Sequence, residues 1–178
     1  MSVMKMLEPL VPTIEQIASQ FVSSIRNGGK IIWMGNGGSA ADAQHLAAEL
    51  VGRFRRERDA LPSIALTTDT SILTAVANDY GYENIFSRQI NGLCNPEDIV
   101  AGISTSGNSE NVLKGIEAAK KKGAFTIGFS GGMDGGMLKK NVELCVHVSA
   151  ATTARIQEAH IFIGHVICDL VEEACMPA

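Results

Sequence analysis

The stretch from residue 99 to residue 109, IVAGISTSGNS, constrains the fold of this chain more than any other. Its first five residues are apolar or small and uncharged, as in a strand that is buried on both faces of a parallel sheet. Three hydroxyl residues, a glycine and Asn108-Ser109 follow, and apolar residues then recur at helical spacing from residue 110 to 122. The stretch therefore predicts a strand, a tight polar loop and a helix, with Asn108 or Ser109 as its N-cap.

The polar loop is a candidate anion site. A helix N-terminus offers free backbone N–H groups and the positive end of the helix dipole. The hydroxyls of Ser104, Thr105, Ser106 and Ser109 would add donors at the same point, and phosphate is the anion we expect there. A capped, serine-rich turn without a ligand is the alternative, and the loop sequence by itself leaves both open.

The rest of the chain repeats the order of strand, loop and helix. We expect further strands at residues 30–34, 63–66, 124–129 and 143–148, and helices at 13–27, 40–54, 110–122 and 152–175, with short helices between 71 and 93 and a glycine-rich turn at 130–136. Strands that alternate with helices indicate a parallel α/β sheet. Residues 1–178 are predicted to form one domain, on which residues 1–29 pack as a helical segment.

Composition narrows the classes of function. A formal charge of -4 with 19% charged residues gives no basic excess for binding nucleic acid. The chain is long enough to bury a core without disulfides, and its four cysteines lack CxxC spacing, so we expect them reduced and mostly buried. It has no apolar run of 18 residues and no signal-peptide layout, which predicts a cytoplasmic protein without a membrane partner.

A second glycine-rich loop follows the predicted strand 30–34. Gly35, Gly37 and Gly38 suggest a dinucleotide fingerprint, but position 40 is alanine and no acidic residue ends the next predicted strand. A nucleotide cofactor is therefore not expected. Because ligands of open α/β sheets gather at the carboxyl ends of the strands, the two polar loops are still predicted to share one edge.

Two predicted helices carry ionisable residues that need an explanation. His45 and Glu49 are four residues apart and lie on one face, where they can ligate a metal, act as an acid/base pair or only contact each other at the surface. The last helix carries His165 beside a well-defined apolar face. Its other candidates, Glu158 and His160, are expected only to satisfy neighbouring groups.

With these residues in hand, the chain resembles the bacterial phosphoheptose isomerases of the sugar isomerase (SIS) domain family. The resemblance runs from about residue 30 onward. It rests on the motifs GNGGS at 35–39, HLAAE at 45–49, LP at 61–62, ANDYG at 77–81, FSRQ at 86–89, GISTSGNS at 102–109 and RIQE at 155–158, and on His160 and His165.

The resemblance implies a flavodoxin-like parallel sheet with helices on both faces, and a homotetramer with active sites at subunit interfaces. It also implies conversion of sedoheptulose 7-phosphate to D-glycero-D-manno-heptose 7-phosphate through an enediolate. That product would supply heptose for the lipopolysaccharide core or other surface glycans. The expected partner is a small sugar phosphate, and neither nucleic acid nor a membrane is expected.

The resemblance also assigns roles to residues. Glu49 and His165 would be the catalytic acid/base pair, and one zinc ion per site would be bound by His45, Glu49, Gln157 and His165. Ser104, Thr105, Ser106 and Ser109 would bind the phosphate, and Asn36, Gly37, Gly38, Ser39, Arg53, Asp79 and Gln157 would contact the rest of the substrate.

Helix geometry adds an expectation about the zinc ligands. Gln157 and His165 are eight residues apart in one predicted helix, which corresponds to a rise of about 12 Å. Zinc ligands must lie within about 2 Å of one ion. If both residues bind the same zinc, we therefore expect one of them to come from a neighbouring subunit.

Two other classes of protein have this fold, and the first of them also has much of the motif set. A relative that binds a replication initiator lacks acid/base residues at the positions of Glu49 and His165, whereas both are present here. A regulatory SIS module would need a fused partner domain, for which 178 residues leave no room. The sequence therefore favours an enzyme over a binding protein.

Overall fold

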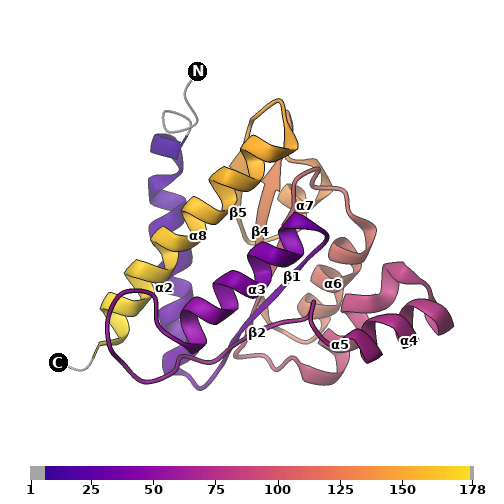
Figure 1. Ribbon diagram of the computed structural model, residues 1–178, viewed down its shortest axis with the longest axis horizontal. Coiled ribbons are helices and arrows are strands. Elements are labelled where there is room, and N and C mark those ends of the chain that lie inside the picture. The colour runs from indigo at the N-terminus through magenta and orange to yellow at the C-terminus, as the bar shows by residue number, and fades with distance from the viewer. Residues whose placement is uncertain (1–6, 177–178) are drawn as a thin grey trace.

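The protein forms one five-stranded parallel sheet in the computed structural model, which describes residues 7–176 (Figure 1). The strand order is β2-β1-β3-β4-β5, the flavodoxin-like order. The strands are β1 (Ile31–Gly35), β2 (Ser63–Ala65), β3 (Ile99–Ser104), β4 (Phe125–Gly131) and β5 (Leu144–Val148). The predicted fold class is confirmed. The first six residues of the predicted segment 1–29 and the last two of the predicted domain lie outside the described residues.

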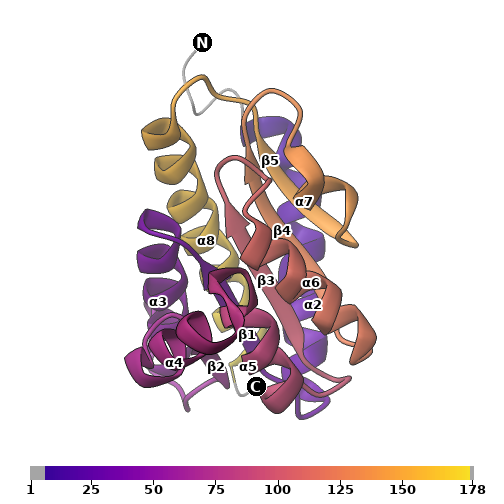
Figure 2. The same cartoon turned by 90° about the vertical axis from the view of Figure 1, so that its right-hand side faces the viewer.

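Helices cover both faces of the sheet (Figure 2). They are α2 (Val11–Arg26), α3 (Gly38–Val51), α4 (Thr70–Tyr80), α5 (Ile85–Leu93), α6 (Glu110–Lys121), α7 (Gly136–Lys140) and α8 (Thr153–Cys175), with 3₁₀ turns η1 (Glu8–Leu10) and η2 (Tyr82–Asn84). Helices α2, α3 and α8 share one core with the sheet, and α4 to α7 share the other.

The central strands β1 and β3 are buried along their whole length. Successive side chains of each strand point to opposite faces of the sheet and so fill the two cores alternately. On the α2/α8 face, Trp33 packs edge-on against Phe21 at 5.5 Å between ring centroids and lies 6.0 Å from Phe129. Its indole N–H donates to the Ser63 hydroxyl at 3.0 Å, so the ring is buried without an unpaired donor.

Helices α3 and α8 lie side by side and run in the same direction (Figure 1). At their N-terminal ends Gly38 lies against Gln157, and further along Leu46 lies against Gly164. A Cβ atom at position 164 would lie 2.5 Å from Leu46 Cδ2, so the missing side chain allows this close approach. The pairing brings His45 on α3 close to His165 on α8.

Two details differ from the sequence-based expectations. The helix predicted at 40–54 ends at Val51, because Gly52 leaves helical geometry and the next backbone N–H groups bond to a distant side chain. The predicted glycine-rich turn at 130–136 is shortened at both ends, since β4 runs to Gly131 and the short α7 begins at Gly136.

The cysteines match the expectation. All four are free thiols, with Cys94 and Cys168 buried and Cys145 and Cys175 half-buried. Between residues 7 and 176, no helix combines the length and the apolar character needed to cross a membrane.

Candidate functional site

The loop between β3 and α6 gathers hydroxyl groups around Ser104. The Ser104 hydroxyl lies 2.9 Å from that of Ser109 and 3.4 Å from that of Ser106. Ser109 is the N-cap residue of α6, as predicted, but its hydroxyl accepts no hydrogen bond from the first turn. The predicted side-chain cap is therefore absent. The Ser109 hydroxyl turns toward Ser104, and the backbone N–H of Val112 donates to the Asn111 side chain at 2.9 Å. Among the described residues, the backbone N–H groups of residues 110 and 111 are the ones that this helix end leaves to an anion.

Gly107 fixes the shape of this loop. Its φ is +67°, and a Cβ atom there would lie 2.0 Å from the carbonyl oxygen of Gly135. The Gly107 carbonyl accepts from the backbone N–H of Leu138 at 2.8 Å, and the Asn108 side chain accepts from that of Met137 at 3.0 Å. The loop therefore rests on α7, which holds the hydroxyls in place before any ligand arrives.

The second predicted loop, after β1, lies at the same edge of the sheet. Asn36 exchanges two 2.8 Å hydrogen bonds with the buried amide of Asn111 in α6, and it also accepts from the Tyr82 hydroxyl at 2.9 Å. Gly37 has a φ of +54° and begins the turn into α3. Ser39 is only 4% exposed and packs beneath Gly35. The expected sharing of one edge by the two polar loops is confirmed by the Asn36–Asn111 pair.

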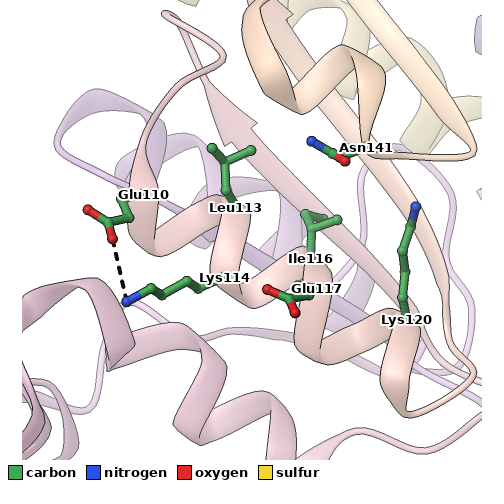
Figure 3. A pocket seen from close by; sticks show the side chains of 7 residues that line it. All are labelled: Glu110, Leu113, Lys114, Ile116, Glu117, Lys120 and Asn141. Carbon is green, nitrogen blue, oxygen red and sulfur yellow. Dashed lines mark ion pairs between the residues drawn. The ribbon is translucent and has the colours of Figure 1, made fainter.

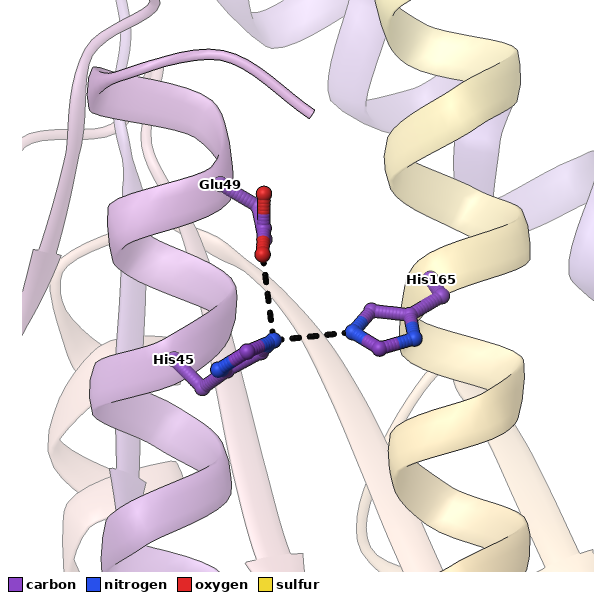
Figure 4. Close-up of side chains that lie close together, drawn as sticks. All are labelled: His45, Glu49 and His165. Carbon is purple, nitrogen blue, oxygen red and sulfur yellow. Dashed lines mark hydrogen bonds and ion pairs between the residues drawn. The ribbon is translucent and has the colours of Figure 1, made fainter. Parts of the chain in front are cut away.

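His45, Glu49 and His165 converge between α3 and α8 (Figure 4). The Nε2 atom of His45 lies 2.8 Å from that of His165 and 3.1 Å from Glu49 Oε1. One ligand atom from each residue lies within 4.8 Å of the others. Two imidazole nitrogens and a carboxylate oxygen in this arrangement match the three protein ligands of a catalytic zinc site.

Gln157 does not belong to this cluster within one chain. Its amide lies against Gly38 at the start of α3, seven residues before His45, which corresponds to a rise of about 10 Å. The geometric expectation that Gln157 and His165 of one chain cannot reach the same ion agrees with this placement. The subunit that supplies a fourth ligand stays a prediction.

Asp42 lies one turn before His45 on α3 and is a further ionisable group beside the cluster, one that the motifs do not include. Burial raises its pKa from 3.8 to about 6, while the nearby His45 acts in the opposite direction. Its Oδ2 atom is buried and has no hydrogen-bond partner among the described residues. The three-residue spacing from His45 was the signal that could have identified this carboxyl.

Two predicted substrate residues stand apart from the others. Arg53 follows α3 and pairs with the exposed Glu57 at 3.5 Å. Asp79, near the end of α4, is exposed and accepts from the side chain of Asn78 at 2.8 Å. Within residues 7–176, no hydrogen bond or ion pair joins either residue to the other candidates, so their roles stay predictions.

A separate hollow lies on the outer side of α6 (Figure 3). Its lining comes from α6 and from Asn141 just after α7, and Lys114 there pairs with Glu110 at 3.4 Å. None of the predicted site residues lines it. The other charged side chains of the lining pair with residues outside it, Glu117 with Lys121 and Lys120 with Glu143. We therefore assign the function to the sheet edge and the α3/α8 cluster instead.

Comparisons with known proteins agree with this placement. The family model described as SIS domain matches residues 2–131. The phosphoheptose isomerase of Roseiflexus sp. (strain RS-1) is 56% identical over 166 residues, which are 93% of this chain and 84% of that protein. The enzyme of the same name from Aquifex aeolicus is 55% identical over 160 residues, 90% of this chain and 83% of that protein.

The chain belongs to the phosphoheptose isomerases of the SIS-domain family.

Solved structures of the family superpose closely on this fold. The phosphoheptose isomerase of Neisseria gonorrhoeae aligns with a TM-score of 0.90 at 42% identity, covering 96% of this chain and 90% of that one. The phosphoheptose isomerase of Francisella tularensis aligns with a TM-score of 0.91 at 39% identity and the same coverage. The family resemblance inferred from the motifs is therefore confirmed, and with it the architecture that holds the candidate site.

Phe54 is a second residue that the sequence did not reveal. Its ring stacks on the His165 imidazole, with centroids 5.2 Å apart and planes inclined by 30°. Phe54 lies in the sequence RFRRER at residues 53–58, and such a run of charged residues is typical of an exposed surface segment. An aromatic residue inside that run was the available signal.

Proposed function

We propose that this protein is an aldose–ketose isomerase that converts sedoheptulose 7-phosphate to D-glycero-D-manno-heptose 7-phosphate through an enediolate. The observation that carries the proposal is the convergence of the Glu49 carboxylate and the His165 imidazole on His45, in a chain whose relatives are phosphoheptose isomerases. A carboxylate and an imidazole are the two groups that this proton-transfer chemistry requires.

The phosphate of the substrate would bind at the loop between β3 and α6. The hydroxyls of Ser104, Thr105, Ser106 and Ser109 and the open N-terminus of α6 offer donors to a dianion there. This end of the substrate does not react. Its binding energy would therefore position the carbonyl end near the acid/base pair.

Proton transfer would begin at the carbon next to the ketose carbonyl. Glu49 faces His45 with Oε1, and we assign its other carboxylate oxygen to take the C1 proton and return it to C2. His165 would move the second proton between the two substrate oxygens. The two transfers together exchange the ketone at C2 for an aldehyde at C1, with no change in oxidation state of the whole molecule.

Zinc is the metal that we propose for the cluster, one ion per site. The imidazoles of His45 and His165 and the Oε1 atom of Glu49 would bind it, with Gln157 from a neighbouring subunit as the fourth ligand. When bound, the ion would stabilise the negative charge of the enediolate oxygens. His165 would have to leave the ion in order to transfer a proton, because its Nε2 lone pair cannot hold zinc and a proton at once.

The assembly and the metabolic role follow from the same proposal. We expect a homotetramer whose active sites lie between subunits, since Gln157 and the cluster of one chain are separated along α8. The heptose phosphate product would feed the lipopolysaccharide core or another surface glycan. The alternative of a non-catalytic binding protein is not favoured, because both acid/base positions are occupied and converge.

Isomerisation in deuterium oxide tests the proposal. The protein is incubated with sedoheptulose 7-phosphate, and the products are followed by NMR. We expect the heptose 7-phosphate to appear with solvent deuterium at the carbon next to its carbonyl. Absence of turnover with the metal-supplemented protein would contradict the function, and turnover without any deuterium would contradict the enediolate. Fructose 6-phosphate under the same conditions tests whether chain length matters.

A further inference from the structure

The segment that follows α3 is fixed by one carboxylate from α8. Glu172 is fully buried, and its two oxygens accept from the backbone N–H groups of Phe54, Arg55 and Arg56 at 3.0, 2.8 and 2.8 Å. Figure 1 shows the segment looping from the end of α3 past the C-terminal half of α8. The loop has no helix or strand of its own, so these bonds determine its path.

Arg58 joins the same carboxylate to the end of α3. Its Nε atom lies 3.2 Å from Glu172 Oε1, an ion pair in which the N–H makes no hydrogen bond with any described residue. Its guanidinium donates to the carbonyls of Glu49 and Leu50 at 2.9 Å each and to that of Gly52 at 3.2 Å. A cation on these carbonyls caps the C-terminal end of the helix that carries His45 and Glu49.

Glu172 is charged in this setting. Burial is the largest single effect and would raise its pKa, but the three backbone donors and Arg58 together outweigh it, so the pKa lies below its ordinary value. A buried carboxylate is costly unless its partners satisfy it, and here every partner belongs to one short segment. The segment and Glu172 therefore form a single rigid unit.

This unit determines what lies against His165. Glu172 is seven residues, or two turns, after His165 on α8. Phe54, the first residue that Glu172 holds, stacks on the imidazole of His165 at 5.2 Å. The Nε2 atom of the same imidazole lies 2.8 Å from that of His45 (Figure 4). Phe54 therefore contacts the ring of the residue whose Nε2 atom meets the cluster.

We propose that Glu172 is a positioning residue for catalysis, because it holds the backbone at Phe54 so that the phenyl ring fixes the imidazole of His165 in register with His45 and Glu49. The proposal rests on the proposed function for the role of His165. In this proposal Glu172 acts on His165 through Phe54. Arg58 connects Glu172 to the carbonyls at the end of α3 and so keeps that helix end in place beside α8.

The test compares Glu172→Gln with Glu173→Gln. The first variant keeps the size of the side chain but turns an NH₂ group toward backbone donors. The second removes a charge from the neighbouring side chain, which is 69% exposed and, among residues 7–176, forms an ion pair only with Arg56, at 3.8 Å. Two quantities are measured: kcat and KM for the sugar phosphate, and the imidazole Cε1–H resonance of His165 in metal-free protein, assigned by its loss in His165→Asn.

We expect Glu172→Gln to lower kcat about 10- to 100-fold with little change in KM, the usual effect of a misplaced catalytic group. The His165 resonance should shift, while Glu173→Gln should leave kcat and the resonance as in the wild type. A folded Glu172→Gln protein with a native His165 resonance would overturn the proposal. The resonance does not depend on turnover, so this result is distinguishable from a failure of the proposed function.

Phe54→Leu keeps the proposal testable if Glu172→Gln does not fold. Phe54 is half-buried, and leucine preserves the apolar contact without the flat ring. We expect a comparable loss of kcat at unchanged KM, with a native circular dichroism spectrum. A kcat equal to that of the wild type would show that stacking on His165 has no catalytic role, which would also overturn the proposal.

Discussion

His160 and His165 lie five residues apart on α8 in opposite surroundings. His165 faces His45 in the half-buried cluster, whereas His160 is 1% exposed, with Nε2 3.0 Å from the Ser130 carbonyl and its ring edge-on to Phe129. Burial is the main cause that lowers the pKa of His160 from 6.5 to about 4, and the hydrogen bond to Ser130 opposes it only in part. The expectation that His160 satisfies a neighbouring group is confirmed.

The buried imidazole predicts acid lability between pH 6.5 and pH 4. The unfolded chain binds a proton on His160 below pH 6.5, and the folded protein does so only below about pH 4. Stability from this group is therefore present above pH 6.5 and is lost as the pH falls toward 4, by about 2 to 3 kcal/mol at pH 4.5. His160→Gln keeps an N–H donor for Ser130 and should remove this loss.

Urea unfolding of both proteins at pH 7 and pH 4.5 measures this effect. The wild type should lose more unfolding free energy between the two pH values than His160→Gln does. An equal loss in both proteins would assign the acid sensitivity to other groups.

The acid/base pair gives the second prediction at this scale. Glu49→Gln or His165→Asn should lower kcat at least about 100-fold, the usual contribution of general acid/base catalysis. Both changes keep size and polarity, so the melting temperature should remain close to that of the wild type. Glu117→Gln on the exposed side of α6, where Glu117 pairs with Lys121 at 2.7 Å, is the matched control. Near-normal kcat in either site variant contradicts the assigned role.

At the scale of elements, the loop between β3 and α6 predicts how the phosphate binds. Ser106→Ala or Ser109→Ala should weaken binding of the sugar phosphate and of inorganic phosphate alike. The expected loss is about 0.5–3 kcal/mol per hydroxyl, with the larger value for a bond to a charged oxygen. Calorimetric titration measures it. Equal affinity of the wild type for the sugar with and without its phosphate would contradict an anion site here.

The elements themselves were largely predictable from the sequence, and the reasons are local. Residues 99–109 contain a complete strand, loop and helix start, and helices α2, α6 and α8 follow apolar spacing. The end of α3 was not predictable. Its next N–H groups bond to Glu172, more than a hundred residues away in the chain, and a single-sequence pattern carries no signal for such a contact.

The candidate site was also predictable where its residues lie close together in the sequence, and was missed where they meet only through the fold. His45 and Glu49 share a helix face, so their spacing reveals them, whereas His165 needed the family resemblance to join them. The parts that were missed act through tertiary packing: Phe54 touches His165 only after the chain leaves α3, and Glu172 reads as an ordinary helix residue. Neither has a motif of its own.

At the scale of the whole molecule, the separation of Gln157 from the cluster predicts a shared active site. Inactive Gln157→Ala and His165→Ala proteins are mixed under conditions that allow subunit exchange. If each site takes Gln157 from one chain and His165 from another, random mixing in a closed symmetric oligomer restores roughly a quarter of the sites. Activity after mixing, compared with either variant alone, measures this.

Mass measurement by light scattering and exchange of a labelled subunit are the controls for this experiment. Demonstrated exchange without recovered activity would mean that one chain supplies both residues, or that only one of them binds the metal. A monomeric wild type with full activity would contradict the interface site directly.

The contact of Gly164 with Leu46 sets the distance between α3 and α8 beside the site, because glycine has no Cβ atom to push Leu46 away. His165 directly follows Gly164 and His45 directly precedes Leu46, so one added methyl group would act as a wedge beside the ligand cluster. The space between the helices holds the side chains of both positions, so a larger residue at position 164 requires a smaller one at position 46. Gly164→Ala alone should therefore lower the activity, and the double variant Gly164→Ala/Leu46→Val should regain part of it. The combined size of these two residues then determines how far apart α3 and α8 lie.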